Sequence, residues 1–252
     1  NGSGRTYVAW NWKANGSGSS NTDGTITSTV SANTDAGFSI VGYTGNSSTN
    51  QTVGHGLSKT PDIVIIKSRD DASAYWSVIN PRRVSAADPN ILYLNDTMAE
   101  ADSTNIMGDN LPTATTVGVD DYDGTNKNGD DFIMYCWHDV DGFSKMGTYT
   151  GNGNADGTFV YTGFRPAYVM IKGANITSHW QIHDTARSTY NVMGDQLHAN
   201  TNDADASNAA YYIDSVSNGF KLRMSHSGQN GNGQFYLFMA FAETPFKYSN
   251  AR

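Results

Sequence analysis

The sequence lacks the features on which several common classes of protein depend. Its 252 residues include one cysteine, Cys136, so no disulfide can form within the chain. Lysine and arginine number 16 against 24 acidic residues and form no basic stripe, which disfavours binding to nucleic acid. No apolar run approaches the roughly 18 residues of a membrane-spanning helix. We therefore expect neither a nucleic-acid partner nor insertion into a membrane.

Catalytic motifs are missing as well. The sequence contains no G-x-S-x-G elbow, no P-loop and no dinucleotide-binding fingerprint. Cys136 lies between Tyr135 and Trp137 in an apolar run, where we expect a buried strand and not a nucleophile. The sequence thus predicts a protein that is not an enzyme and has no catalytic residues. A polysaccharide-degrading enzyme stays an alternative, because paired loop carboxylates are recognised only by their spacing in three dimensions.

Aromatic and turn-forming residues dominate what is present. There are 14 Tyr, 10 Phe and 5 Trp among 26 Gly and long polar tracts, a composition typical of many short strands. Ile63 to Ile66 is a continuous apolar run that predicts a strand covered on both faces, whereas Trp76 and Val78 alternate with polar neighbours. These patterns predict an all-β protein of β-sandwich or jelly-roll-like units. Short helices are expected near Thr97 to Ala101 and near Asp203 to Ala206.

An internal repeat organises the chain. Gly37-Phe38-Ser39 precedes Tyr43-Thr44-Gly45-Asn46, and Gly142-Phe143-Ser144 precedes Tyr149-Thr150-Gly151-Asn152. The order of motifs persists downstream, which predicts an internal duplication of one unit. The predicted divisions are an N-terminal aromatic strand and Gly/Ser-rich linker over residues 1–36, one β-sandwich unit over 37–141 and a second over 142–252.

The N-terminal segment contains one aromatic strand more than two units require. Tyr7, Trp10 and Trp12 resemble the aromatic runs that end each unit, and residues 14–36 read as a linker or long loop. The extra strand has three interpretations: the chain, which opens on Asn1, is a fragment of a longer array; the strand closes a sheet within the chain; or it pairs with a neighbouring subunit by strand donation. We name it the assembly strand.

Two sets of residues are candidates for ligand binding. Aromatic rings on loops stack on sugars, and the aromatic residues selected for a glycan contact are Trp10, Tyr43, Tyr122 and Tyr190. Core packing is the competing interpretation for each ring. Alternating carboxylate and amide oxygens suit Ca²⁺, although the EF-hand order is absent and a solvated hairpin loop is the alternative. The candidate calcium ligands are Asp120, Asp121, Asp123, Asn128 and Asp130.

A histidine pair offers a third candidate site. His179 and His183 stand four residues apart, a spacing that suits zinc on a helix. Trp180 and Ile182 alternate with them as on a strand, so we expect surface polar residues instead.

Several ordered motifs resemble a known group of proteins. They are Tyr7-Val-Ala-Trp-Asn-Trp-Lys-Ala-Asn-Gly16, Ser20-Asn-Thr-Asp-Gly-Thr-Ile-Thr-Ser-Thr-Val-Ser-Ala-Asn33, Val53-Gly-His-Gly56, Tyr161-Thr-Gly-Phe-Arg-Pro166 and Ala242-Glu-Thr-Pro-Phe-Lys247. The whole chain resembles an uncharacterised C-terminal domain in structural, tail-fibre-like proteins of marine tailed phages. The resemblance implies exposure on the virion, a tail-fibre, adhesin or decoration role, and no catalytic residues.

These observations give three functional hypotheses. The first is a virion surface or extracellular protein that forms a homo-oligomer or binds other virion proteins, and contacts a host surface glycan. The second is a self-assembling extracellular filament subunit that donates its assembly strand. The third is the polysaccharide-degrading enzyme. No cofactor is expected unless the acidic loop binds Ca²⁺.

Overall fold

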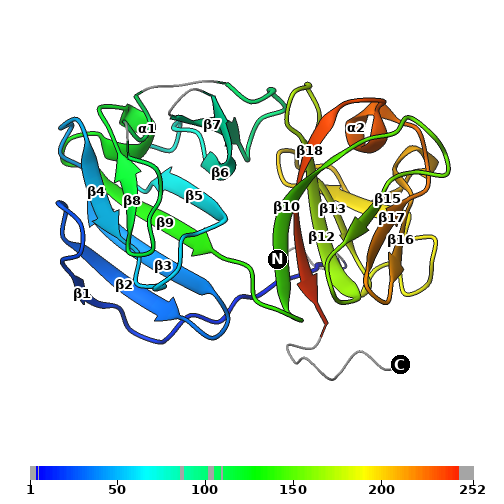
Figure 1. Cartoon of the computed structure of the whole chain (residues 1–252), viewed down its shortest axis with the longest axis horizontal. Coiled ribbons are helices and arrows are strands. Elements are labelled where there is room, and N and C mark those ends of the chain that lie inside the picture. Colours follow the sequence, from blue (N-terminus) through cyan, green and yellow to red (C-terminus); the bar gives the residue numbers. More distant parts are fainter. Residues whose placement is uncertain (1–3, 5, 86–87, 102–104, 109, 244–252) are drawn as a thin grey trace.

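The protein is almost entirely β-structure in a computed structural model, which confirms the predicted fold class. All its named strands pair antiparallel, and the halves of the chain form two sandwich-like units side by side (Figure 1). No helix among the described residues is long and apolar enough to cross a membrane. The structure describes residues 4, 6–85, 88–101, 105–108 and 110–243.

The first unit packs a seven-stranded sheet against a two-stranded sheet. Apolar side chains of both sheets meet in one cluster, to which Val53 and Val117 contribute from the small sheet. The one-turn helix α1 (Asp123–Asn126) follows the small sheet. In order across the large sheet, the strands are β1 (Ser19–Asn21), β2 (Ser28–Asn33), β3 (Phe38–Thr44), β9 (Asp131–Trp137), β5 (Ile63–Ser68), β6 (Ser77–Ser85) and β7 (Asp88–Tyr93), and the small sheet holds β4 (Gln51–Gly54) and β8 (Thr116–Val119).

The second unit repeats this plan with a six-stranded and a three-stranded sheet. Its own apolar cluster joins the two sheets, with Phe220 and Leu222 from the small one. The helices here are η1 (Ala209–Tyr211) and α2 (Ser227–Asn230). The large sheet runs β10 (Ser144–Thr150), β18 (Phe235–Ala242), β12 (Pro166–Gly173), β13 (Gln181–Asp184), β14 (Asp195–His198) and β15 (Ala206–Ser207), and the small one runs β11 (Phe159–Tyr161), β17 (Gly219–Leu222) and β16 (Ile213–Val216).

Corresponding tyrosines make the same contacts in the two units. The Tyr43 hydroxyl donates to the carbonyl oxygen of Thr125 in α1 at 2.5 Å. The Tyr149 hydroxyl donates to the carbonyl oxygen of Gln229 in α2 at 2.6 Å. Each tyrosine thus ties its strand to the one-turn helix of its own unit.

Corresponding asparagines repeat a second set of contacts. The side-chain oxygen of Asn126 accepts the backbone N–H of Asn46 at 2.9 Å, and that of Asn230 accepts the N–H of Asn152 at 3.0 Å. Asn126 and Asn230 are both fully buried, so their amides need partners inside the protein. The two units therefore share these contacts in detail, while a duplication of one ancestral unit stays a prediction from the sequence.

A third apolar cluster joins the two units. It lies between the two large sheets and takes Ile65 and Trp137 from the first and Met170, Met239 and Phe241 from the second. Each large sheet is therefore buried on both faces along its central strands, as the continuous apolar run at Ile63 to Ile66 predicts.

Residues 7–12 form no strand in this structure, so the predicted strand conformation is wrong for the single chain. The segment is extended, and alternate residues are half-buried against the shared cluster. Trp12 packs edge-on against Trp137, Tyr168 and Phe241, with ring centroids 6.0, 5.8 and 5.3 Å away. The segment therefore lies between the ends of β9 and β18 in the same chain.

Two further predictions need correction. The supposed linker over residues 14–36 contains β1 and β2, because Ile26 and Val30 reach the core of the first unit and anchor the polar residues around them. Residues 97–101 form no helix, and the helical turn expected near 203–206 lies instead at Ala209 to Tyr211.

Trp12→Ala should lower the free energy of unfolding by about 2 kcal/mol, since a half-buried ring loses part of the 3 to 5 kcal/mol typical of a core aromatic. Urea denaturation of the whole chain measures this change in the free energy of unfolding. Tyr190→Ala is the matched control, because that ring is 84% exposed. A Trp12→Ala effect no larger than the control's would show that the N-terminal segment is not part of the fold.

Candidate functional site

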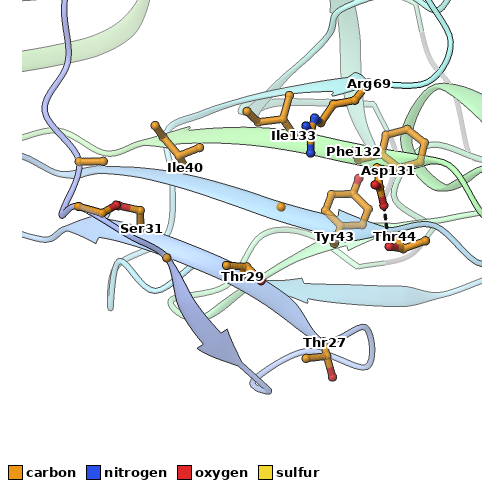
Figure 2. Close-up of a pocket in the computed structure, with 14 residues that line it drawn as sticks. Thr27, Thr29, Ser31, Ile40, Tyr43, Thr44, Arg69, Asp131, Phe132 and Ile133 are labelled. Carbon is orange, nitrogen blue, oxygen red and sulfur yellow. Dashed lines mark hydrogen bonds between the residues drawn. The ribbon is translucent and has the colours of Figure 1, made fainter.

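A groove of about 560 Å³ crosses the outer part of the large sheet of the first unit. It lies on the sheet face that carries Ile40, beyond the end of the apolar layer shared with the second unit. Figure 2 shows side chains of three neighbouring strands, β2, β3 and β9, pointing into it. The residues that line it are Ala14, Gly16, Gly18, Thr27, Thr29, Ser31, Ile40, Gly42, Tyr43, Thr44, Arg69, Asp131, Phe132 and Ile133.

Strand alternation explains why the groove is polar. In β2, Val30 points into the core and is 7% exposed, so Thr29 and Ser31 point the other way. In β3, Val41 is buried, and Gly42 leaves the groove floor without a side chain. The result is a shallow surface of hydroxyl groups around a bare backbone floor.

The N-terminal segment forms one wall of the groove. The Ser31 hydroxyl donates to the carbonyl oxygen of Gly16 at 2.9 Å and accepts the N–H of Asn15 at 3.0 Å. These two bonds hold residues 14–18 beside β2.

Charged groups stand at the other end of the groove. Thr44 Oγ1 donates to Asp131 Oδ1 at 2.8 Å, which orients that carboxylate, as the dashed line in Figure 2 marks. The side chain of Arg69 projects over Ile133 (Figure 2). Its guanidinium makes no hydrogen bond or ion pair with any described residue. A guanidinium with unused donors is suited to a carboxylate, sulfate or phosphate group on a ligand.

The aromatic residues predicted to bind glycan do not gather at this site. Tyr43 is 5% exposed and stacks on Phe132 in the core, so its prediction as an exposed ring is wrong. The Tyr122 hydroxyl lies 3.3 Å from that of Tyr93 in a half-buried position. Of these four predicted residues, Tyr190 alone is highly exposed. Trp10 is half-buried, with its ring 5.4 Å from that of Tyr168.

The acidic loop does not bring three of its carboxylates together. Asp120 Oδ1 accepts the N–H groups of Asn50 at 3.0 Å and of Asp121 at 2.8 Å. Asp130 Oδ2 accepts from Ser68 at 3.1 Å. Across the described part of the chain, no group of three or more His, Cys, Asp or Glu side chains is placed to hold a metal ion. The carboxylates instead organise the turns around α1, where Asp123 is the first helical residue and Asn128 is exposed.

His183 is fully buried, which corrects the prediction of a surface residue. It lies on β13 among other buried polar side chains, and its Nε2 is 2.7 Å from Gln229 Nε2. His179 does not join it, because its ring stacks on that of His198 at 4.5 Å. Sequence alternation could have shown that His183 shares a face with Gln181, but not that α2 covers this face.

Burial shifts the pKa values of His183 and Cys136. Burial, helped by the nearby charge of Arg187, lowers the pKa of His183 to about 3, so the ring is neutral at pH 7. Burial also raises the pKa of the Cys136 thiol to about 12. A thiolate nucleophile at Cys136 is therefore disfavoured.

Comparison with known families gives one match for this chain. The chain belongs to DUF7483, a domain of unknown function. The DUF7483 model matches residues 1–245, which include both units, the groove and the N-terminal segment. The search of curated proteins and the search of solved structures returned no match.

The free energy of unfolding should fall as the pH is lowered from 6.5 toward 3, because His183 is protonated in the unfolded chain but not in the folded one. One proton contributes about 1.4 kcal/mol for each pH unit. In His183→Gln, the slope of the free energy of unfolding against pH should decrease by up to this amount. Chemical denaturation from pH 4 to pH 8 measures the free energy of unfolding of the wild type and of the variant, and so both slopes. The difference between the two free energies at pH 8 gives the packing cost of the substitution. Equal slopes would show that His183 is accessible to protons in the folded state.

Proposed function

We propose that this DUF7483 chain is a non-catalytic surface module of a virion or other extracellular assembly, and that it contacts a host glycan through the groove of the first unit. The observation that carries the proposal is the groove itself. Hydroxyls of Thr27, Thr29 and Ser31 line one side, and the unpaired Arg69 guanidinium stands at the far end. Saccharides need such a combination of hydrogen-bonding groups on a preformed surface.

The charge at the end of the groove favours an acidic saccharide. Arg69 has its full set of donors available, whereas Asp131 is already bonded to Thr44. A carboxylate or sulfate on the sugar would form a charge-assisted, bidentate contact with Arg69. Ile40 and Ile133 provide the apolar surface against which a sugar ring packs.

The virion setting is supported by the sequence motifs that resemble phage tail-fibre-like proteins. The surface role also fits the disposition of the most reactive groups, since Cys136 and His183 are buried away from the groove. An enzyme acting on the same saccharide is the competing function, with Asp70 and Asp131 as neighbouring carboxylates beside the groove: the N–H of Asp131 donates to Asp70 Oδ2 at 2.6 Å.

A Gly42→Val variant tests the groove directly. The added Cβ would meet no atom closer than the Thr29 carbonyl oxygen at 4.0 Å, so the fold should persist while the groove floor is filled. Binding to an array of host-surface acidic polysaccharides should fall at least tenfold in Gly42→Val. In Arg69→Gln it should fall by about tenfold, equivalent to about 1.4 kcal/mol, and lose most of its salt dependence.

The controls separate the groove from other surfaces and from catalysis. Tyr190→Ala removes the most exposed aromatic ring among the described residues and should leave binding unchanged. Loss of binding in Tyr190→Ala but not in Gly42→Val would place the glycan elsewhere. Release of new reducing ends from the bound polysaccharide would identify an enzyme instead.

A further inference from the structure

The outer edge of β10 has no partner strand among the described residues. β10 is the first strand of its sheet, and β18 is the one strand paired with it; its first residue, Ser144, also forms an isolated bridge with Val140. In the first unit, the corresponding strand β3 lies between β9 and β2. The second unit has no equivalent of β2, because the chain passes from β9 to β10 through residues 138–143 alone.

The direction of the backbone groups follows from the bonds at the two ends of β10. The N–H of Ala242 donates to the carbonyl oxygen of Phe143, and the N–H of Gly151 donates to that of Gln234. Odd-numbered residues of β10 therefore face β18. Even-numbered residues direct their N–H and C=O groups to the open edge.

Both ends of this edge are closed by side chains. The N–H of Met146 donates to Asp139 Oδ1 at 2.7 Å, and Thr158 Oγ1 donates to the carbonyl oxygen of Thr150 at 2.9 Å. The groups that remain unpaired are the Met146 carbonyl, the N–H and carbonyl of Thr148, and the Thr150 N–H. An unpaired row of this kind is a template for another strand.

The unpaired groups are symmetric about Thr148, and this symmetry identifies the partner. In a second chain running antiparallel, Thr148 faces Thr148 and each exchanges N–H and carbonyl with the other, while each Met146 carbonyl accepts from the partner's Thr150 N–H. Every free group then has a partner. The Asp139 and Thr158 side chains give up their bonds to the Met146 N–H and the Thr150 carbonyl, because the partner's Thr150 carbonyl and Met146 N–H face these same groups. We infer that two copies of this chain join β10 to β10 about a two-fold axis, forming one sheet across the dimer.

The first unit shows a strand paired at the equivalent position. There β2 pairs antiparallel with β3, with Ser31 opposite Ile40 and Thr29 opposite Gly42. Ile40 and Gly42 correspond to Met146 and Thr148 in the repeat. The fold therefore accommodates a strand at this edge.

The surroundings of the edge are accessible and apolar. Thr148 is exposed, and a groove of about 360 Å³ runs between β10 and β11. Phe159 and Tyr161 of β11 line that groove and are 45% and 64% exposed. The one charged residue of the strand, Lys145, is ion-paired with Asp139, so no unpaired like charges oppose each other across the axis. Exposed apolar rings beside an open edge are typical of an interface.

Cysteine cross-linking tests the register. In Thr148→Cys, the two cysteines face each other with Cα atoms about 5.5 Å apart, within the range of a disulfide. Thr150→Cys is the matched control: it is also exposed, but its two copies would lie about 13 Å apart along the strands. Under mild oxidation by oxidised glutathione, most of Thr148→Cys should become a covalent dimer and less than a tenth of Thr150→Cys. Cys136 is fully buried and should not react.

The mass in solution gives a second, independent test. Sedimentation of the unmodified chain should give about twice its 27.2 kDa at micromolar concentration. Thr148→Pro removes an N–H that points away from β18, so the monomer should fold, with unchanged circular dichroism, and sediment at half the mass. A wild-type monomer at these concentrations, or equal cross-linking of the two cysteine variants, would overturn the inference. So would a dimer that survives Thr148→Pro but is lost on deletion of residues 6–13, because that result identifies strand donation instead.

Discussion

Apolar side chains of the two large sheets bury one another in a single layer, and the rest of the molecule is arranged around it. Each sheet already has a small sheet on its other face, so its central strands are covered twice. Trp12 packs against this layer near the ends of β9 and β18. The buried ammonium of Lys172 donates to the carbonyls of Gly173 at 2.8 Å and of Thr97, in the other unit, at 3.3 Å. Burial lowers the pKa of Lys172 to about 8, and these carbonyl contacts offset part of the cost of holding its charge there.

The layer also determines where the groove lies. Where the two sheets pack together, alternate residues of β3 such as Phe38 are apolar and covered. Further along β2 and β3 the same face is not covered, and the alternating positions carry Thr29, Gly42 and Thr44. A polar groove thus follows from the point at which the shared core ends.

The sequence predicted the parts of the fold that depend on local pattern. The run at Ile63 to Ile66 indicated a strand buried on both faces, and the structure agrees. Predictions from local pattern were wrong where a segment distant in the sequence determines the burial or conformation of a residue. Tyr43 is a core residue because α1 accepts its hydroxyl hydrogen bond, and residues 28–33 form a strand because β3 offers them an edge. The groove was missed for the same reason, since its hydroxyls and Arg69 come from separate strands and no motif links them.

The two units differ mainly where one of them lacks a covering segment or packs a different side chain. His183 lies in the interior of the second unit where the repeat places Ile79 in the first, so a buried polar side chain at this position is specific to one unit. The larger difference is the hairpin of β1 and β2, which covers β3 while its counterpart β10 stays open. Two sandwich units, one with a protected edge and one with an open edge, are asymmetric: under the proposals above, the first unit would offer a face for a ligand and the second an edge for another chain. The groove and the β10 edge lie on different sheets. A partner strand paired with β10 would therefore make no backbone pairing with the groove residues. Two copies joined in this way would present two grooves, and multivalent contact of that kind raises the strength of attachment to a surface that displays many copies of one glycan.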